Sequence, residues 1–323
     1  MSQHDGAVLR GFRTGDGPEV VETWCRSAPA DPLTPDRFRS LVLLDANFDP
    51  EGLRLAVSGG RVAGAAYAVR RLVPQSGTDL EPEQGWIPFF FVDPAARGRG
   101  LGRRLLTDAL DWLHGHGRTR VDFASYTPNY LLPGLDTATY PEAAGLLASL
   151  GFRTLYEAAA MDRSLVGYRL PDEIARRRDD LTARGYRFAT PADDDLVDLI
   201  ALAGSRFDAD WARAIRACCA AGTSLDRIVV ARDPSGRLAG WAMHGAYEQA
   251  AERFGPFGVR EELRGSGVGK VLLHLVLERM RARGAHGAWF LWTGEDSPAG
   301  RLYRAAGFTT TRVFRVLRRE AAR

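Results

Sequence analysis

Two glycine-rich stretches decide the fold of this chain: Arg97-Gly98-Arg99-Gly100-Leu101-Gly102 and Arg264-Gly265-Ser266-Gly267-Val268-Gly269. Each follows a short apolar run typical of a strand, at 86–92 or 256–259. Each also opens a longer run with apolar residues at helical spacing, at 101–117 or 268–284. Glycine lets the backbone approach an anion closely, and the first N–H groups of a helix point at it. Both stretches therefore predict a phosphate-binding loop.

Other landmarks recur in the same order, so the chain contains an internal repeat. GFRT at 11–14 is matched by GYRF at 185–188, GRVAGAAY at 60–67 by GRLAGWAM at 236–243, and SLGF at 149–152 by AAGF at 305–308. The first repeat is longer after its glycine loop, most plausibly at 127–141. We expect an N-terminal domain at 1–168, a linker helix at 169–184 and a C-terminal domain at 185–323.

The composition is that of a globular chain. Its 323 residues are 45% hydrophobic and 26% charged, enough for two cores and too apolar for a disordered chain. Lys and Arg number 43 against 40 Asp and Glu, a net charge of +3, so no nucleic-acid partner is expected.

Neither metal nor membrane binding is expected. Cys25, Cys218 and Cys219 form no disulfide framework and no CxxC pattern, and no His/Cys spacing suits a metal. No apolar run approaches the roughly 18 residues that cross a bilayer, and the start of the chain has no apolar leader. We expect a cytoplasmic protein.

Each repeat is predicted to be α/β. The expected order is a strand, two helices, strands, the glycine loop with its helix, then strand, helix and strand. In the second repeat these elements lie at about 185–190, 193–203, 207–221, 226–232, 237–247, 256–259, 268–284, 288–293, 299–307 and 308–317.

Two other phosphate-binding motifs fit poorly. A dinucleotide loop has GxGxxG after the first strand, with an acid about 20 residues further on. Here the spacing is GxGxG after a fourth strand, and although Asp122 could be that acid, Trp289 occupies the place in the second repeat. A Walker loop needs GxxxxGK followed by Ser or Thr, but Lys270 is followed by Val271.

A strand, an RxxGxG loop, a helix, a strand and a helix ending in (L/Y)xxxGF resemble the GNAT superfamily of acetyl-CoA-dependent N-acetyltransferases, here in tandem. The resemblance implies two domains, each with a mostly antiparallel, twisted sheet that splays between its fourth and fifth strands and is flanked by helices. It also implies coenzyme binding by Phe257, Val259, Arg264, Gly265, Ser266, Gly267, Val268, Gly269 and Lys270, and in the first repeat by Val92, Arg97, Gly98, Arg99, Gly100, Leu101 and Gly102.

The resemblance also suggests catalytic residues. Many relatives have a tyrosine four residues before the glycine of GF that protonates the leaving thiolate, and Tyr303 stands there in the second repeat. The first repeat has Leu147, which has no proton to give. Where relatives have a basic Glu on the fourth strand, this chain has Phe254 and Ile87. The candidates near enough in sequence, acting directly or through a water, are Glu248, Glu252, Glu261 and His244.

The expected function is transfer of an acetyl group from acetyl-CoA to a primary amine of a small molecule or peptide, by direct attack. We expect a monomer or homodimer whose C-terminal domain is catalytic and whose N-terminal domain binds coenzyme A or is structural. One alternative is a non-catalytic acetyl-CoA sensor. Another is catalysis in the N-terminal domain, through one of its own tyrosines. Tyr126, Tyr130 and Tyr140 in its insertion could form a substrate-binding lid or pack the longer loop.

Overall fold

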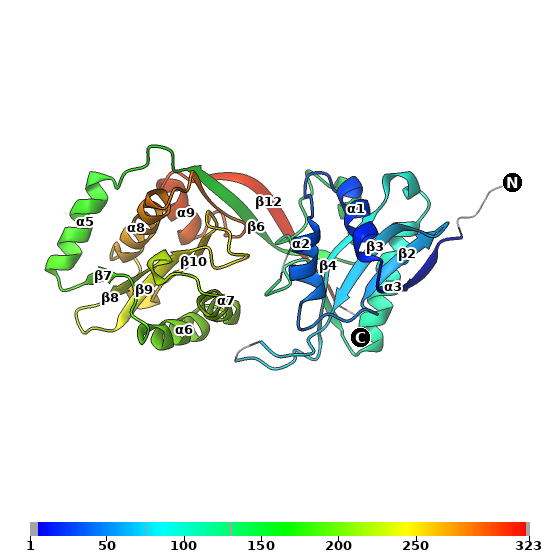
Figure 1. Cartoon of the computed structure of the whole chain (residues 1–323), viewed down its shortest axis with the longest axis horizontal. Coiled ribbons are helices and arrows are strands. Elements are labelled where there is room, and N and C mark those ends of the chain that lie inside the picture. Colours follow the sequence, from blue (N-terminus) through cyan, green and yellow to red (C-terminus); the bar gives the residue numbers. More distant parts are fainter. Residues whose placement is uncertain (1–5, 76, 130, 321–323) are drawn as a thin grey trace. The chain divides into compact units, whose positions relative to one another are not determined.

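The computed structural model describes residues 6–75, 77–129 and 131–320 of the chain. These residues fall into two compact units, whose elements are labelled in Figure 1. The N-terminal unit comprises 6–74, 79–158 and 313–320, and the C-terminal unit comprises 75, 77–78 and 159–312. Both are mixed α/β units, as predicted. The boundaries 1–168, 169–184 and 185–323 stay a prediction, since neither unit is one continuous piece of chain.

The N-terminal unit follows the predicted order of elements. Its strands are β1 (Val8–Gly11), β2 (Leu53–Ser58), β3 (Arg61–Val69), β4 (Gln84–Val92), β5 (Arg120–Phe123) and the first part of β6 (Arg153–Ser164). Its helices are α1 (Gly17–Ser27), the short α2 (Pro35–Phe38), α3 (Leu101–Gly115) and α4 (Pro141–Ser149). In the insertion at 127–141, the described residues before α4 form no helix or strand. Leu135 makes an isolated β-bridge with Arg315.

The C-terminal unit repeats this order after the linker helix α5 (Asp172–Ala183). Its strands are β7 (Arg187–Ala189), β8 (Ile228–Arg232), β9 (Leu238–His244), β10 (Phe254–Val259), β11 (Gly287–Phe290) and the first part of β12 (Thr309–Glu320). Its other helices are α6 (Asp195–Arg206), α7 (Ala209–Ala220), α8 (Val268–Ala282) and α9 (Pro298–Ala305).

The N-terminal sheet opens between β4 and β5. These strands pair in parallel only over 84–87 and 120–123, whereas β1 to β4 pair antiparallel. Pro88 follows at once and lacks the N–H that a further rung would need. The β3–β4 register also shifts at this level, between Tyr67 and Val69, which is a usual place for a strand proline. The predicted splay between the fourth and fifth strands therefore begins at Pro88.

The C-terminal unit opens at the equivalent place. Strands β7 to β10 form an antiparallel sheet with β10 at its edge. β10 and β11 meet in one isolated bridge, between Arg253 and Trp289. Pro256 lies in β10 where the register against β9 shifts, between Phe254 and Phe257. Beyond the bridge, the edge of β10 has backbone groups free to bind a ligand.

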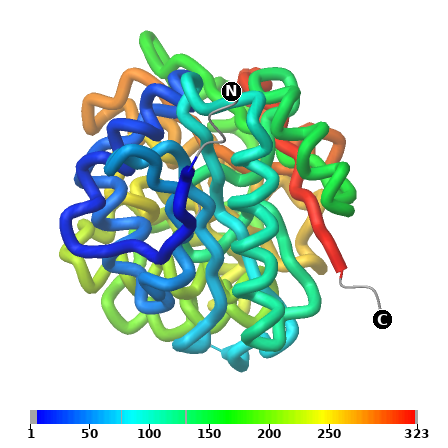
Figure 2. Tube along the Cα trace, turned by 90° about the vertical axis from the view of Figure 1, so that its right-hand side faces the viewer, coloured from blue at the N-terminus to red at the C-terminus, as the bar shows by residue number. Residues whose placement is uncertain are grey.

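β6 and β12 each contribute residues to both units. In the N-terminal unit, Leu317–Glu320 of β12 pairs with β5, and Figure 2 shows the red end of this strand beside that unit. Arg318 donates from Nε and Nη2 to the Asp122 carboxylate at 2.7 and 2.9 Å. In the C-terminal unit, Met161–Ser164 of β6 pairs with β11. Each unit thus contains a strand segment from the other repeat.

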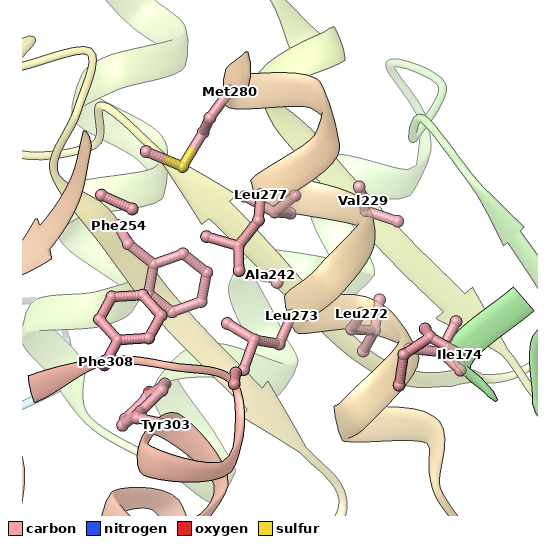
Figure 3. Close-up of a cluster of buried hydrophobic side chains, with 14 of the residues drawn as sticks. Ile174, Val229, Ala242, Phe254, Leu272, Leu273, Leu277, Met280, Tyr303 and Phe308 are labelled. Atoms are coloured by element: carbon pink, nitrogen blue, oxygen red, sulfur yellow. The ribbon is translucent and has the colours of Figure 1, made fainter. Parts of the chain in front are cut away.

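The helix after each glycine loop anchors the core of its unit. Leu105, Leu106 and Leu113 of α3 are fully buried in the N-terminal unit. Leu273 and Leu277 of α8 are fully buried in the C-terminal unit, in the cluster drawn in Figure 3. Within the described ranges, no helix combines the length and the apolar character needed to cross a membrane.

Candidate active site

The two glycine loops have the same backbone conformation. Gly98 and Gly100 have φ of +76° and +78°, and Gly265 and Gly267 have φ of +81° and +94°. Side chains rarely adopt these angles, so glycine is required at all four positions. Each helix begins at the next residue, and the N–H groups of its first turn have no intrahelical acceptor. Both loops can therefore bind a phosphate through backbone amides.

The third glycine of each loop serves packing. A Cβ on Gly102 would lie 3.1 Å from Leu146 Cδ2 of α4, and a Cβ on Gly269 would lie 3.3 Å from Val259 Cγ2 of β10. Both distances are tight for carbon atoms, so a side chain would push the loop helix away from its neighbour. These glycines bring each helix start close to the splay.

The first arginine of each loop has different partners in the two repeats. Arg97 donates from Nε to Val92 O at 3.1 Å and from Nη2 to Ser27 O at 2.8 Å, which ties the end of β4 to α1. Arg264 instead pairs with Glu261 at 3.0 Å, with both side chains exposed. Anion binding in both loops is therefore left mainly to the backbone.

The linker helix α5 lies against the C-terminal loop. A Cβ on Gly267 would lie 2.9 Å from Arg177 Cδ, and Lys270 Nζ donates to Glu173 Oε1 at 3.0 Å. Arg177, the middle residue of the Arg176-Arg177-Arg178 run in this helix, therefore contacts the phosphate loop.

A cavity of about 670 Å³ occupies the splay of the N-terminal unit. Its walls come from the end of α1, the second half of β4, the glycine loop, the insertion and α4. Of the coenzyme-binding residues predicted in this repeat, all but Arg99 line it: Val92, Arg97, Gly98, Gly100, Leu101 and Gly102. The cavity combines free amides at the loop with apolar walls, which suits a phosphate-bearing ligand with an apolar arm.

Tyr126 and Tyr140 of the first repeat lie in different places. Tyr140 lines the cavity and donates to Asp31 Oδ2 at 2.6 Å. Tyr126 is fully buried, and its hydroxyl oxygen accepts from Asn47 Nδ2 at 2.8 Å, so it packs the unit. Tyr130 lies outside the described residues.

Tyr303 lies on α9 among phenylalanine rings of the C-terminal unit. Its ring centroid is 4.5 to 6.2 Å from those of Phe254, Phe257, Phe290 and Phe308. Figure 3 shows Tyr303, Phe254 and Phe308 at one end of the apolar cluster. Burial raises the pKa of the Tyr303 phenol, so it stays protonated. Among the described residues none forms a hydrogen bond with its hydroxyl, whereas Leu147 in the first repeat is simply buried.

Two of the candidate bases, Glu252 and Glu248, are engaged. Glu252 Oε1 accepts from the backbone N–H of His286 at 2.7 Å and of Gly287 at 3.1 Å, so it fixes the start of β11. Glu248 has φ of +52° and pairs with Arg253 at 3.0 Å. These contacts favour structural roles. The described part of the chain holds no group of three or more His, Cys, Asp or Glu side chains that could bind a metal.

Sequence reasoning missed a polar cluster beside Glu248. Asp210, in the first turn of α7, is 3% exposed and accepts from the Tyr247 hydroxyl at 2.9 Å. The Arg253 guanidinium carbon lies 4.5 Å from the centroid of the Tyr247 ring. An acid in the first turn of a helix is ordinary, and these residues are far apart in sequence. No local pattern could have brought them together.

The family model described as the acetyltransferase (GNAT) family matches residues 18–130 and 180–308. The mycothiol acetyltransferase of Clavibacter michiganensis subsp. michiganensis (strain NCPPB 382) is 27% identical over 317 residues, covering 91% of this chain and 88% of that relative.

Solved structures have the same fold. The GCN5-related glucosamine N-acetyltransferase region of a fungal multi-domain β-N-acetylglucosaminidase superposes with a TM-score of 0.80 at 20% identity, over 97% of this chain and 38% of that one. A tandem GNAT protein from the clavulanic acid biosynthesis pathway gives a TM-score of 0.64 at 18% identity, over 98% and 99%. The family ranges include both glycine loops. The chain therefore belongs to the acetyltransferase (GNAT) family, with two copies of the family's fold.

Proposed function

We propose that this chain moves the acetyl group of acetyl-CoA to the primary amine of a small molecule, and that its C-terminal unit performs the transfer. The observation that carries the proposal is Tyr303. Its phenol is protonated, has no hydrogen-bond partner among the described residues, and lies beside β10 at the splay. Leu147 at the equivalent place in the N-terminal unit cannot supply a proton.

The C-terminal unit offers the other parts of an acetyl-CoA site. The amides of the 264–270 loop would hold the pyrophosphate, since they lie at the N-terminus of α8, where the helix dipole favours an anion. The free edge of β10 around Phe257 and Val259 would pair with the pantetheine arm. Bound acetyl-CoA supplies the thioester that the amine attacks, and Tyr303 would protonate the departing thiolate.

A small-molecule acceptor is supported by the relatives. The matched Clavibacter protein is named mycothiol acetyltransferase, and the match extends over nearly the whole of both chains. At 27% identity the acceptor of this chain can differ, so a panel of amines is needed. It should contain mycothiol without its acetyl group, an amino sugar, a polyamine, an amino acid, an aminoglycoside and a peptide lysine.

The test measures thiol release from acetyl-CoA with this panel, in the wild type and in Gly267→Asp. We expect release above the buffer rate with at least one small amine, and its loss in Gly267→Asp, because a carboxylate there repels the phosphate. Coenzyme binding without release for any amine would identify a non-catalytic sensor. Release that survives Gly267→Asp would exclude the C-terminal unit as the catalyst.

A specific observation favours a second candidate, catalysis in the N-terminal unit. Tyr140 lines the cavity there, and its hydroxyl is oriented by Asp31. Tyr140→Phe and Tyr303→Phe separate the candidates, because only the variant of the active unit loses turnover. Our proposal requires that the loss occur in Tyr303→Phe and that Tyr140→Phe stay within about threefold of the wild type.

A further inference from the structure

A buried carboxylate in the C-terminal unit lacks part of its hydrogen bonding. Asp210 is 3% exposed, and its Oδ2 accepts from the Tyr247 hydroxyl at 2.9 Å. Its Oδ1 is buried and has no hydrogen-bond partner within the part of the chain that the structure describes. Leaving a buried polar atom unpaired costs free energy, so such atoms are rare and often serve a function.

The Asp210–Tyr247 pair lies on the opposite face of the sheet from Tyr303. Phe254 and Phe290 pack on Tyr303 within the α8 cluster. Their neighbours Arg253 and Trp289 point the other way, because side chains alternate along a strand. The Arg253 guanidinium carbon lies 4.5 Å from the Tyr247 ring centroid and 5.6 Å from that of Trp289, which agrees with this direction.

The position of Arg253 places Tyr247 at the opening of the sheet. The bridge between Arg253 and Trp289 is the last rung between β10 and β11, and the strands diverge beyond it. We expect an acceptor that reaches a thioester beside Tyr303 from the other face to pass this point. Tyr247 is partly exposed, whereas Asp210 behind it is closed off from water.

We propose that Tyr247 contacts the acceptor amine and takes up its proton, with Asp210 as the positioning residue that receives the proton of Tyr247 in turn. The inference rests on the proposed function, and it names the proton route of the same site. The fourth strand has Phe254 where a base would be expected, and Glu252 and Glu248 are engaged elsewhere. The buried pair is a route that the geometry offers beside these two residues.

The proton balance of the step is complete. The neutral amine forms a bond to the thioester carbonyl carbon, and its nitrogen becomes positively charged. That nitrogen loses a proton to Tyr247 Oη while the Tyr247 proton passes to Asp210 Oδ2. The C–S bond breaks, and the thiolate takes a proton from Tyr303. Asp210 then gives its proton to water, and Tyr303 regains a proton from water.

Charges around the pair suit this role. Burial raises the pKa of Asp210 to about 6, with a smaller contribution from Asp208. The hydrogen bond from Tyr247 is the largest effect that opposes this rise, and Arg213 and Arg253 oppose it less. Above about pH 6 the carboxylate is ionised and can accept a proton. Arg253 over the ring of Tyr247 stabilises the negative charge that the phenol oxygen gains during transfer.

The experiment compares Tyr247→Phe with Tyr168→Phe, using the best acceptor of the amine panel. Tyr168 is the matched control, because it is a half-buried tyrosine of the same unit whose hydroxyl bonds His274 Nδ1 at 2.7 Å. We expect Tyr247→Phe to lower kcat by about 10- to 100-fold, with the KM of acetyl-CoA within about twofold. Tyr168→Phe should stay within about twofold. Turnover of Tyr247→Phe equal to that of the control overturns the inference.

Asp210→Asn tests the pH dependence of kcat, which would not change if Asp210 had only a structural role. Asparagine can still accept a hydrogen bond from Tyr247, but it cannot take up a proton. In the wild type, kcat should fall as the pH drops through about 6, and this limb should disappear in Asp210→Asn together with most of the turnover. Retained turnover with an unchanged limb overturns the inference, even if the melting temperature shifts.

Failure of the inference can be told apart from failure of the proposed function. If Gly267→Asp abolishes turnover and Tyr247→Phe does not, the C-terminal unit is active and the proton takes another route. If turnover survives Gly267→Asp, or no amine is acetylated, the proposed function fails and the inference fails with it.

Discussion

At the scale of single residues, the prediction that is most directly tested concerns the Tyr303 hydroxyl. We expect Tyr303→Phe to lower kcat by about 10- to 300-fold, at the low end of acid–base effects, because a coenzyme thiolate can leave without full protonation. The KM of acetyl-CoA should change little, since the lost interaction forms chiefly in the transition state. Steady-state kinetics beside a thermal melt provide the measurement. A small loss of stability with turnover within about twofold would leave Tyr303 as a packing residue.

Glu252 should behave in the opposite way. Because its carboxylate accepts two backbone N–H groups at the start of β11, we expect Glu252→Ala to lower the free energy of unfolding by about 1–3 kcal/mol. Glu252→Gln keeps one acceptor oxygen and should retain turnover within about threefold. Urea unfolding and thiol release measure the two effects. A stable Glu252→Gln variant with turnover reduced about 100-fold would instead make Glu252 the base.

The residues of the site were predictable only where the chain repeats a pattern. Tyr303 follows from counting back from a Gly-Phe pair, and the loop glycines follow from their spacing. Asp210 and Tyr247 do not, because their meeting depends on how α7 packs on the sheet. Glu252 was selected for its place near the fourth strand, and its backbone contacts are visible only in three dimensions.

At the scale of elements, the equivalent loops predict two coenzyme molecules per chain. Calorimetric titration with acetyl-CoA should show about two sites in the wild type and one in either Gly100→Asp or Gly267→Asp. Gly100→Asp should spare turnover, since we expect the N-terminal site to be structural. A single site in the wild type, abolished by Gly267→Asp alone, would contradict this.

Most elements could be predicted, but the full length of β12 could not. The helix predicted at 268–284 is α8 (Val268–Ala282), and the fourth strands lie where the apolar runs placed them. β12 was predicted to end at 317, yet it continues to Glu320. Its last residues are charged and give no strand pattern. They extend because β5 offers a ladder and Asp122 offers a partner for Arg318.

At the scale of the whole molecule, the exchanged strands make the two repeats depend on each other. Arg318→Ala leaves the buried Asp122 carboxylate unpaired, so we expect a loss of about 1–3 kcal/mol of unfolding free energy. Arg315→Ala is the matched control on the same strand. Arg315 pairs with Glu157, both side chains are exposed, and the pair should contribute less than about 1 kcal/mol to the free energy of unfolding. Urea unfolding of both variants gives the comparison. Equal losses would show that β12 is held by its ladder alone.

The exchange has a consequence for synthesis on the ribosome. A domain at the start of a chain ordinarily folds while the rest is still being translated. Here the N-terminal unit needs residues 313–320, which are translated only after residues 159–312 of the C-terminal unit. Until they emerge, β5 lacks the strand that pairs with its Arg120–Phe123 edge, and Asp122 lacks Arg318. The first repeat therefore cannot complete its sheet until the second has been translated. A stop codon shortly before residue 313 would leave an open strand edge on β5.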